Sequence, residues 1–152
     1  IKQRLGEIYQ QQQQNDLLPA LQLDIGRNYE ALGQLKQAFS SYQQAYTAAW
    51  KLQQYAQASD ALRQMVQLYR SQQQTEAALQ TSQILLESDR LAANFYGMMN
   101  TYDQIGQINL TRGNYERALT AFQQGLKLAQ QLKYQEDYFT QQIQKINRQP
   151  TN

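Results

Sequence analysis

Cysteine and histidine are both absent from this chain of 152 residues. Their absence excludes thiol chemistry, zinc sites built from Cys and His, haem ligation by His, and every catalytic triad that needs an imidazole. It also leaves the redox compartment unreadable. A chain of this length buries about 70% of the surface that it exposes when unfolded, so it needs neither a disulfide nor a metal to fold.

Charge and long apolar runs are also scarce. Only 17% of the residues are charged and the net charge is +2, which gives no strong signal for nucleic acid or an anionic membrane. No apolar run approaches the roughly 18 to 20 residues that span a bilayer, and residues 1–14 lack the apolar core of a signal peptide. We therefore expect a cytoplasmic chain, preferentially monomeric, without membrane insertion or a nucleic-acid partner. Because the chain opens on Ile1 and not on Met, an upstream targeting segment stays open.

Proline occurs only at Pro19 and Pro150, and glutamine, with 32 residues, dominates the intervening sequence together with Ala and Leu. These residues tolerate helices, and apolar side chains recur at helical spacing, as at Leu21, Ile25 and Tyr29. The sequence predicts an all-α chain of about eight helices joined by short turns. The expected breaks are Asn15–Asp16, Gly33, Gln72–Thr75, Ser88–Asp89, Gly113–Asn114 and the region near Lys133.

Three segments repeat with a period of 40 residues, which is the most informative feature of the sequence. Each begins with a large apolar residue, often followed by glycine and an aromatic residue, and continues with alanine and a second large residue. Small residues let paired helices approach closely, and large ones fill the space between them. The expected packing residues are Ile25, Gly26, Tyr29, Ala38, Tyr42 and Ala45 in the first copy, Leu62, Met65, Tyr69 and Ala78 in the second, and Tyr102, Ile105, Gly106, Ala118, Phe122 and Gly125 in the third.

This pattern resembles the tetratricopeptide repeat (TPR) over residues 19 to about 131. The resemblance is strong in the first and third copies and weak in the second, where Gln73 replaces the turn glycine. Two features depart from the family: the period is 40 residues, where the family has about 34, and the proline that often ends the unit is missing. Longer repeats of this kind are similar to those of kinesin light chains and spindle-orientation adaptors. Armadillo and HEAT repeats remain an alternative.

The resemblance implies a right-handed α-solenoid, or superhelix, of antiparallel helix pairs. We expect one domain with about three repeats and flanking helices. Its parts are a preceding helix at 1–18, repeats at 19–58, 59–98 and 99–132, and a C-terminal capping helix and tail at 133–152. The capping helix is expected to pack through Tyr138, Ile143 and Ile146.

Carboxylate pairs are the strongest catalytic candidates, namely Asp89 with Asp103 and Glu136 with Asp137. We favour a structural interpretation, because acidic residues near helix starts complement the helix dipole. Glu87–Ser88–Asp89 is interpreted as a turn with an N-cap. No glycine-rich phosphate loop is present. The sequence predicts no enzyme, no cofactor and no metal site.

Aromatic residues offer two further candidates. The 11 tyrosines suggest stacking on single-stranded nucleic acid, but no basic groove accompanies them. A cluster on one predicted helix suggests a hydrophobic ligand pocket, although such spacing is more often core. Its members are Phe95, Tyr96, Met98, Met99 and Tyr102.

The remaining candidate site comes from helix geometry. If Ile25, Tyr29 and Leu32 face the partner helix, residues on the opposite side of that helix point toward the inner surface of the solenoid. In the TPR family this concave surface commonly receives an extended peptide or a helix. The candidates in successive repeats are Leu23, Arg27 and Glu30, then Arg63, Gln67 and Arg70, then Asp103, Gln107 and Leu110. They are also compatible with an ordinary solvated face.

The arginines would make one end of this surface basic, which suits an acidic partner segment. The pattern by which some TPR proteins clamp a C-terminal carboxylate is missing. We therefore expect a non-catalytic scaffold or adaptor that binds a peptide or helix of another protein. Two alternatives stay open: a regulatory or sensor segment of a larger enzyme or transcription regulator, and a self-assembling structural module.

Overall fold

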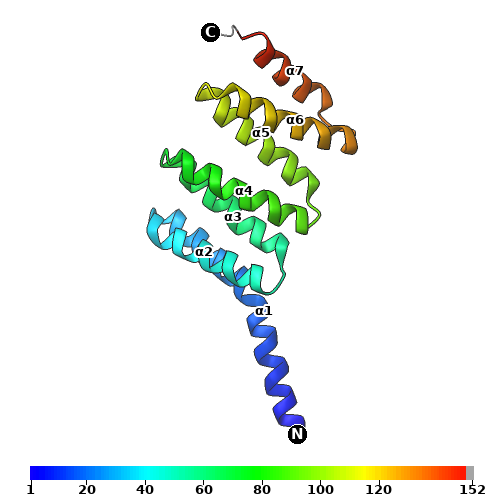
Figure 1. Ribbon diagram of the computed structural model, residues 1–152. Helices are drawn as coiled ribbons and strands as arrows, with labels where there is room; N and C mark the ends of the chain where they lie inside the picture. Colours follow the sequence, from blue (N-terminus) through cyan, green and yellow to red (C-terminus); the bar gives the residue numbers. More distant parts are fainter. Residues whose placement is uncertain (150–152) are drawn as a thin grey trace. The chain divides into compact units, whose positions relative to one another are not determined.

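The computed structural model describes residues 1–149 and arranges them in helices and short turns (Figure 1). The helices are α1 (Lys2–Ala31), α2 (Leu35–Lys51), α3 (Tyr55–Ser71), α4 (Thr75–Leu91), α5 (Phe95–Thr111), α6 (Tyr115–Leu132) and α7 (Glu136–Asn147). Residues 1–149 contain no strand. The all-α fold is confirmed, and consecutive helices pack against each other from α1 to α3 and from α5 to α7, as in an α-solenoid. The predicted tail from Pro150 onward lies outside the described residues.

The helices follow a strict rhythm along the chain. Helices α2 to α5 each have 17 residues, and successive helices from α2 to α6 begin at residues 35, 55, 75, 95 and 115. A pair of helices with its two turns therefore occupies 40 residues, as the sequence period predicts. The departure from the shorter family period is thus accommodated by longer helices, because the turns between them contain only three residues.

The turns share one backbone design. At the first turn, Gly33 N–H donates to the carbonyl of Glu30 and Gln34 N–H donates to the carbonyl of Tyr29. This is the Schellman pattern, which needs a left-handed residue just after the helix. Gly33 and Gly113 supply it at φ values of 74° and 75°. Four other turns place a non-glycine residue in this conformation and keep the same two hydrogen bonds, at Gln53, Gln73, Ala93 and Lys133.

Two expected breaks are wrong. Helix α1 runs without interruption through Asn15, Asp16 and Pro19, so the separate helix predicted at 1–18 is part of α1, and residues 1–149 form seven helices in place of about eight. Proline lacks an N–H group, and a helix interior loses one hydrogen bond there; helix-forming glutamines on one side and packing on the other offset the loss. Ser88 and Asp89 are buried inside α4, and the turn follows at Ala92–Asn94.

The chain divides into two compact units, one comprising residues 1–81 and the other beginning at Ser82, with the boundary inside α4. In the first unit, the core combines Leu23 of α1 with Tyr42 and Ala45 of α2 and with Ala61 and Leu68 of α3. In the second unit, the core includes Met99, Ala118, Phe122, Ala129 and Phe139 from α5, α6 and α7. Each core therefore joins three successive helices.

Glycines allow the closest helix contacts. A Cβ atom added at Gly26 would lie 2.6 Å from two ring carbons of Tyr42, and one at Gly106 would lie 2.5 Å from Phe122 Cε1. Real Cβ atoms do not approach other atoms so closely, so the rings occupy space that only glycine leaves free. The two contacts stand 80 residues apart in sequence, at the same point of the first and third repeats.

Candidate partner-binding surface

In the first unit, α1 carries the first three predicted residues of the inner surface, and they lie in different environments. Leu23 is buried in the core with Ala61 and Leu68 of α3, so its assignment to an exposed binding face is wrong. The helical projection considered only the partner within a pair, whereas α3 of the next pair also covers α1. Arg27 is exposed and lies 3.4 Å from Asp24, measured between Nη1 and Oδ1.

Glu30 is half-buried and anchors the largest fully buried side chain of this unit. The hydroxyl of Tyr42 donates a hydrogen bond of 2.5 Å to Glu30 Oε2. Burial raises the pKa of the Tyr42 hydroxyl well above its ordinary value, and the Glu30 carboxylate raises it further while Arg27 opposes the shift. Glu30 thus joins the inner surface to the core, with its carboxylate committed to Tyr42.

Helix α3 contributes Arg63, Gln67 and Arg70, each 40 residues after its counterpart on α1. Gln67 and Arg70 are exposed, whereas Arg63 is half-buried. Helices α1 and α3 are in contact within this unit. A ring contact between Phe39 of α2 and Tyr69 of α3, with centroids 4.6 Å apart, holds α3 in place beside Arg70. Arg27, Gln67 and Arg70 are therefore the exposed members of the predicted inner surface in the first unit.

In the second unit, two of the predicted residues of α5 are hydrogen-bonded to α7. The hydroxyl of Tyr138 donates to Asp103 Oδ1 at 2.6 Å, and Gln107 Nε2 donates to Tyr138 Oη and to Gln142 Oε1, both at 3.2 Å. Burial, together with the Asp103 carboxylate, raises the pKa of Tyr138. Leu110 is half-buried against the core of this unit. Asp103, Gln107 and Leu110 therefore hold the C-terminal helix and form no surface comparable to that of the first unit.

Sequence reasoning found Tyr138 as a packing residue but missed this polar network. Tyr138 and Gln142 are four residues apart, so they project from the same side of α7. Asp103 and Gln107 have the same spacing on α5. These two matching pairs of polar residues were the signal in the sequence for this network.

The carboxylates considered for catalysis have structural environments. Glu136 and Asp137 lie in the first turn of α7, where negative charge complements the helix dipole. Asp89 is fully buried, and a Cβ added at Gly97 would lie 2.7 Å from its Oδ2 atom. Within residues 1–149, no group of three or more Asp and Glu side chains is arranged to hold a metal ion.

The aromatic and methionine cluster on α5 is divided between two environments. Met99 is buried, Met98 and Tyr102 are half-buried, and Phe95 and Tyr96 are exposed. Tyr96 contacts Tyr134 ring to ring, with centroids 5.9 Å apart. These residues therefore do not converge on one ligand pocket.

Comparison with known proteins bears on the repeats described above. A family model described as "Tetratricopeptide repeat" matches residues 20–49 and 100–132, which are the first and third copies. These two copies are therefore tetratricopeptide (TPR) repeats. Repeats of this family indicate a protein–protein interaction module. The search of curated proteins gave no significant match. Among the described residues of this TPR chain, every helix is too short or too polar to cross a membrane.

Proposed function

We propose that this TPR chain is a non-catalytic adaptor that binds an acidic, extended segment of another protein on the surface formed by α1 and α3. The observation that carries the proposal is the exposure of Arg27, Gln67 and Arg70 on two helices in contact. Arginine forks recognise carboxylates through charge-assisted hydrogen bonds, and a glutamine amide can bond the backbone of an extended peptide. The corresponding residues of the second unit are engaged by α7, so the first unit is the favoured site.

Electrostatics should govern specificity more than raw affinity at such a surface. The exposed arginines attract acidic segments and repel strongly basic ones, whereas the Asp24 carboxylate paired with Arg27 and the Glu30 carboxylate reduce the local positive charge. Exposed charges are screened by salt, so binding should weaken as ionic strength rises. A non-catalytic role agrees with a sequence that offers no thiol or imidazole for acid–base or nucleophilic chemistry.

The test uses an arrayed set of extended peptides of equal length, whose net charge varies from strongly acidic to strongly basic. We expect the acidic members to bind, and the variant Arg27→Glu with Arg70→Glu to weaken them at least tenfold. The matched control, Lys36→Glu with Lys127→Glu, makes the same change in net charge at exposed positions of α2 and α6. An equal loss of affinity in the arginine and lysine variants would show that only net charge matters. Unchanged affinity in the arginine variant would reject the proposed surface.

A further inference from the structure

Helix α1 exposes apolar residues on a face whose equivalent on α3 is buried. On α3, Ala58, Ala61 and Leu62 are buried, and Ala61 shares a core cluster with Tyr42 and Ala45 of α2, which packs against α3. The residues 40 positions earlier on α1 are Leu18, Leu21 and Gln22. Leu18 is 40% exposed and Leu21 is 56% exposed, so this face of α1 lacks the helix that α2 provides for α3.

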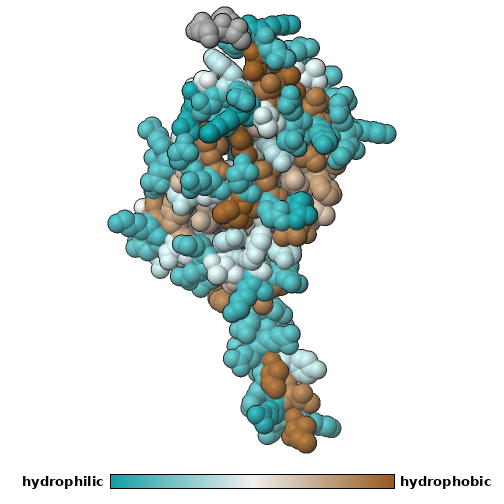
Figure 2. All heavy atoms as spheres, viewed as in Figure 1, coloured by the Kyte–Doolittle hydropathy of each residue, from teal (hydrophilic) through white to brown (hydrophobic). Residues whose placement is uncertain are grey.

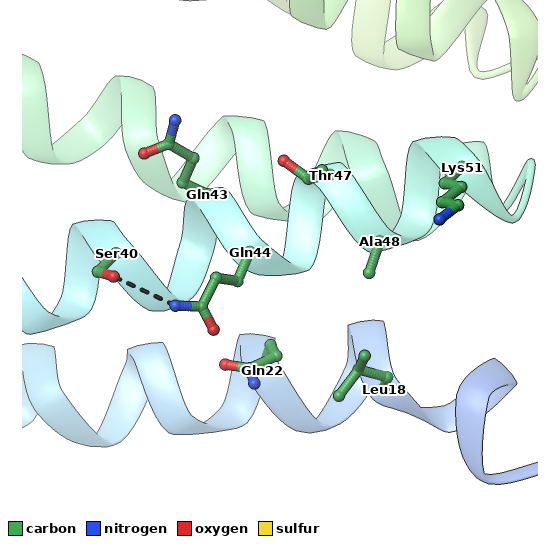
Figure 3. Close-up of a pocket in the computed structure, with 8 residues that line it drawn as sticks. All are labelled: Leu18, Gln22, Ser40, Gln43, Gln44, Thr47, Ala48 and Lys51. Atoms are coloured by element: carbon green, nitrogen blue, oxygen red, sulfur yellow. Dashed lines mark hydrogen bonds between the residues drawn. The ribbon is translucent and has the colours of Figure 1, made fainter.

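A groove runs along this uncovered face. It has a volume of about 620 Å³ and lies between α1 and α2 (Figure 3). In Figure 3 the side chains of Leu18 and Gln22 project from α1 and lie opposite Gln44 and Ala48 of α2. Leu18 and Ala48 give the groove an apolar strip, and amide, hydroxyl and lysine side chains surround it, an arrangement that suits the side of an amphipathic helix.

A helix with suitable side chains is already attached to α1. The N-terminal end of α1 extends beyond α2 and α3 (Figure 1), and apolar side chains gather on one side of it (Figure 2). Ile1, Leu5 and Tyr9 are exposed, and their spacing of four residues places them on one side of the helix. Forty residues later, at the same register, α2 has its buried positions Ser41, Ala45 and Ala49. Residues 1–11 thus carry apolar side chains where α2 makes its packing contacts.

The sequence between this segment and the packed part of α1 matches a turn. Gln12–Gln14 stands 40 residues before Leu52–Gln54, which joins α2 to α3 with Gln53 in the left-handed conformation. A second tripeptide of three glutamines, Gln72–Gln74, forms a turn in this chain, with Gln73 at a φ of 59°. A glutamine tripeptide can therefore adopt either structure here, because it is helical in α1 and a turn between α3 and α4.

Helix geometry favours the N-terminal segment of the same chain over a second copy as the occupant of the groove. Tyr9 and Leu18 are nine residues apart, which is about two and a half turns, so a straight α1 presents them on opposite sides. One straight helix of a second copy could not contact both sides. A turn at Gln12–Gln14 brings them face to face, with Leu5 against Leu21. The equivalent residues Ala45 and Ala61 share one buried cluster.

We propose that residues 1–11 fold back on α1 through a turn at Gln12–Gln14 and occupy the groove beside Leu18 and Leu21. The chain then exchanges between this closed form and the extended α1. The closed form gives α1 the covering helix that α3 receives from α2, and it hides the exposed leucines.

The absence of cysteine makes a direct test available, since two cysteines can be introduced without others to interfere. In the extended α1, residues 5 and 21 are separated by about 24 Å, from about 1.5 Å per residue, whereas a disulfide needs Cα atoms within about 7 Å. Under mild oxidation, Leu5→Cys with Leu21→Cys should form an intramolecular disulfide, seen as a monomer of altered mobility on a non-reducing gel. The control pair is Glu7→Cys with Leu21→Cys, because Glu7 corresponds to the exposed Thr47 of α2.

We expect the first pair to form the disulfide at least tenfold faster than the control pair. Adding Gln13→Gly, which favours the left-handed turn, should accelerate it, and replacing Gln12, Gln13 and Gln14 with alanine should slow it. Equal rates for the two pairs would overturn the proposal. Disulfide-linked dimers without the intramolecular product would also overturn it, and would assign the groove to a second copy. Both results leave the peptide surface of α1 and α3 untouched.

Discussion

Replacing Gly26 with alanine tests the close contact between α1 and α2. The new Cβ would lie 2.6 Å from Cδ1 and Cε1 of Tyr42, whereas carbon atoms in contact are normally about 3.5 to 4.0 Å apart. The ring cannot move away easily, because it is fully buried and its hydroxyl is bonded to Glu30 at 2.5 Å. Overpacking of this kind costs about 1 to 3 kcal/mol, and a ring held at both ends places the cost near about 3 kcal/mol.

Alanine also has a higher helix propensity than glycine, by about 1 kcal/mol. The net loss of unfolding free energy is therefore about 2 kcal/mol, which lowers the melting temperature of a chain of this size by about 4 to 8 °C. Thermal and urea unfolding followed by circular dichroism measure both quantities. The control is Gly6→Ala on the same helix, where an added Cβ meets nothing within 4 Å, and it should not lower the melting temperature.

A double-mutant cycle separates the steric cause from other effects. In a Tyr42→Leu background the ring is gone, so Gly26→Ala should cost much less than in the wild type. The reasoning would be refuted if Gly26→Ala were as stable as the wild type, or if its cost were the same in both backgrounds.

Three further changes test other contacts. Tyr42→Phe should make stability less sensitive to alkali. Above the ordinary tyrosine pKa of about 10, the folded protein retains the Tyr42 proton while the unfolded chain loses it. The unfolding free energy of the wild type therefore falls as pH rises beyond that value, and that of the variant, measured by urea unfolding, should fall less steeply. Tyr138→Phe should speed amide exchange in α7 and leave α2 unchanged, because it removes the bond to Asp103, and equal exchange in α7 would contradict that role. Asn94→Ala should reduce unfolding free energy by about 1 kcal/mol through loss of the N-cap bond to Gly97 N–H, while Asn94→Asp should retain most of it.

The repeat register could be predicted from the sequence because it depends on residue size at fixed spacing. Gly26 and Gly106 indicate where a large side chain of the partner helix packs, and the 40-residue period predicts the positions of the helices. Helix ends were less predictable. The left-handed residue is glycine at Gly33 and Gly113 but glutamine, alanine or lysine elsewhere, so composition alone marks only some turns. Gln12–Gln14 and Gln72–Gln74 show that one tripeptide serves both structures, with the surrounding packing deciding between them.

The binding surface was only partly predictable, for a different reason. Projection onto one helix identifies what faces its partner, but a solenoid helix also contacts the next pair. Leu23 is buried for this reason, and Asp103 and Gln107 are bonded to α7. Arg27, Gln67 and Arg70 are exposed, and the prediction of an inner binding surface rests on these three residues.

The most direct test of the binding proposal is an NMR titration of the isotope-labelled chain with the acidic peptide that binds best. We expect the largest chemical-shift changes at Arg27, Gln67 and Arg70, and none at Gln43 and Thr47 on the outer face of α2. Changes confined to the outer face of α2, with the arginine signals unmoved at saturation, would contradict the account.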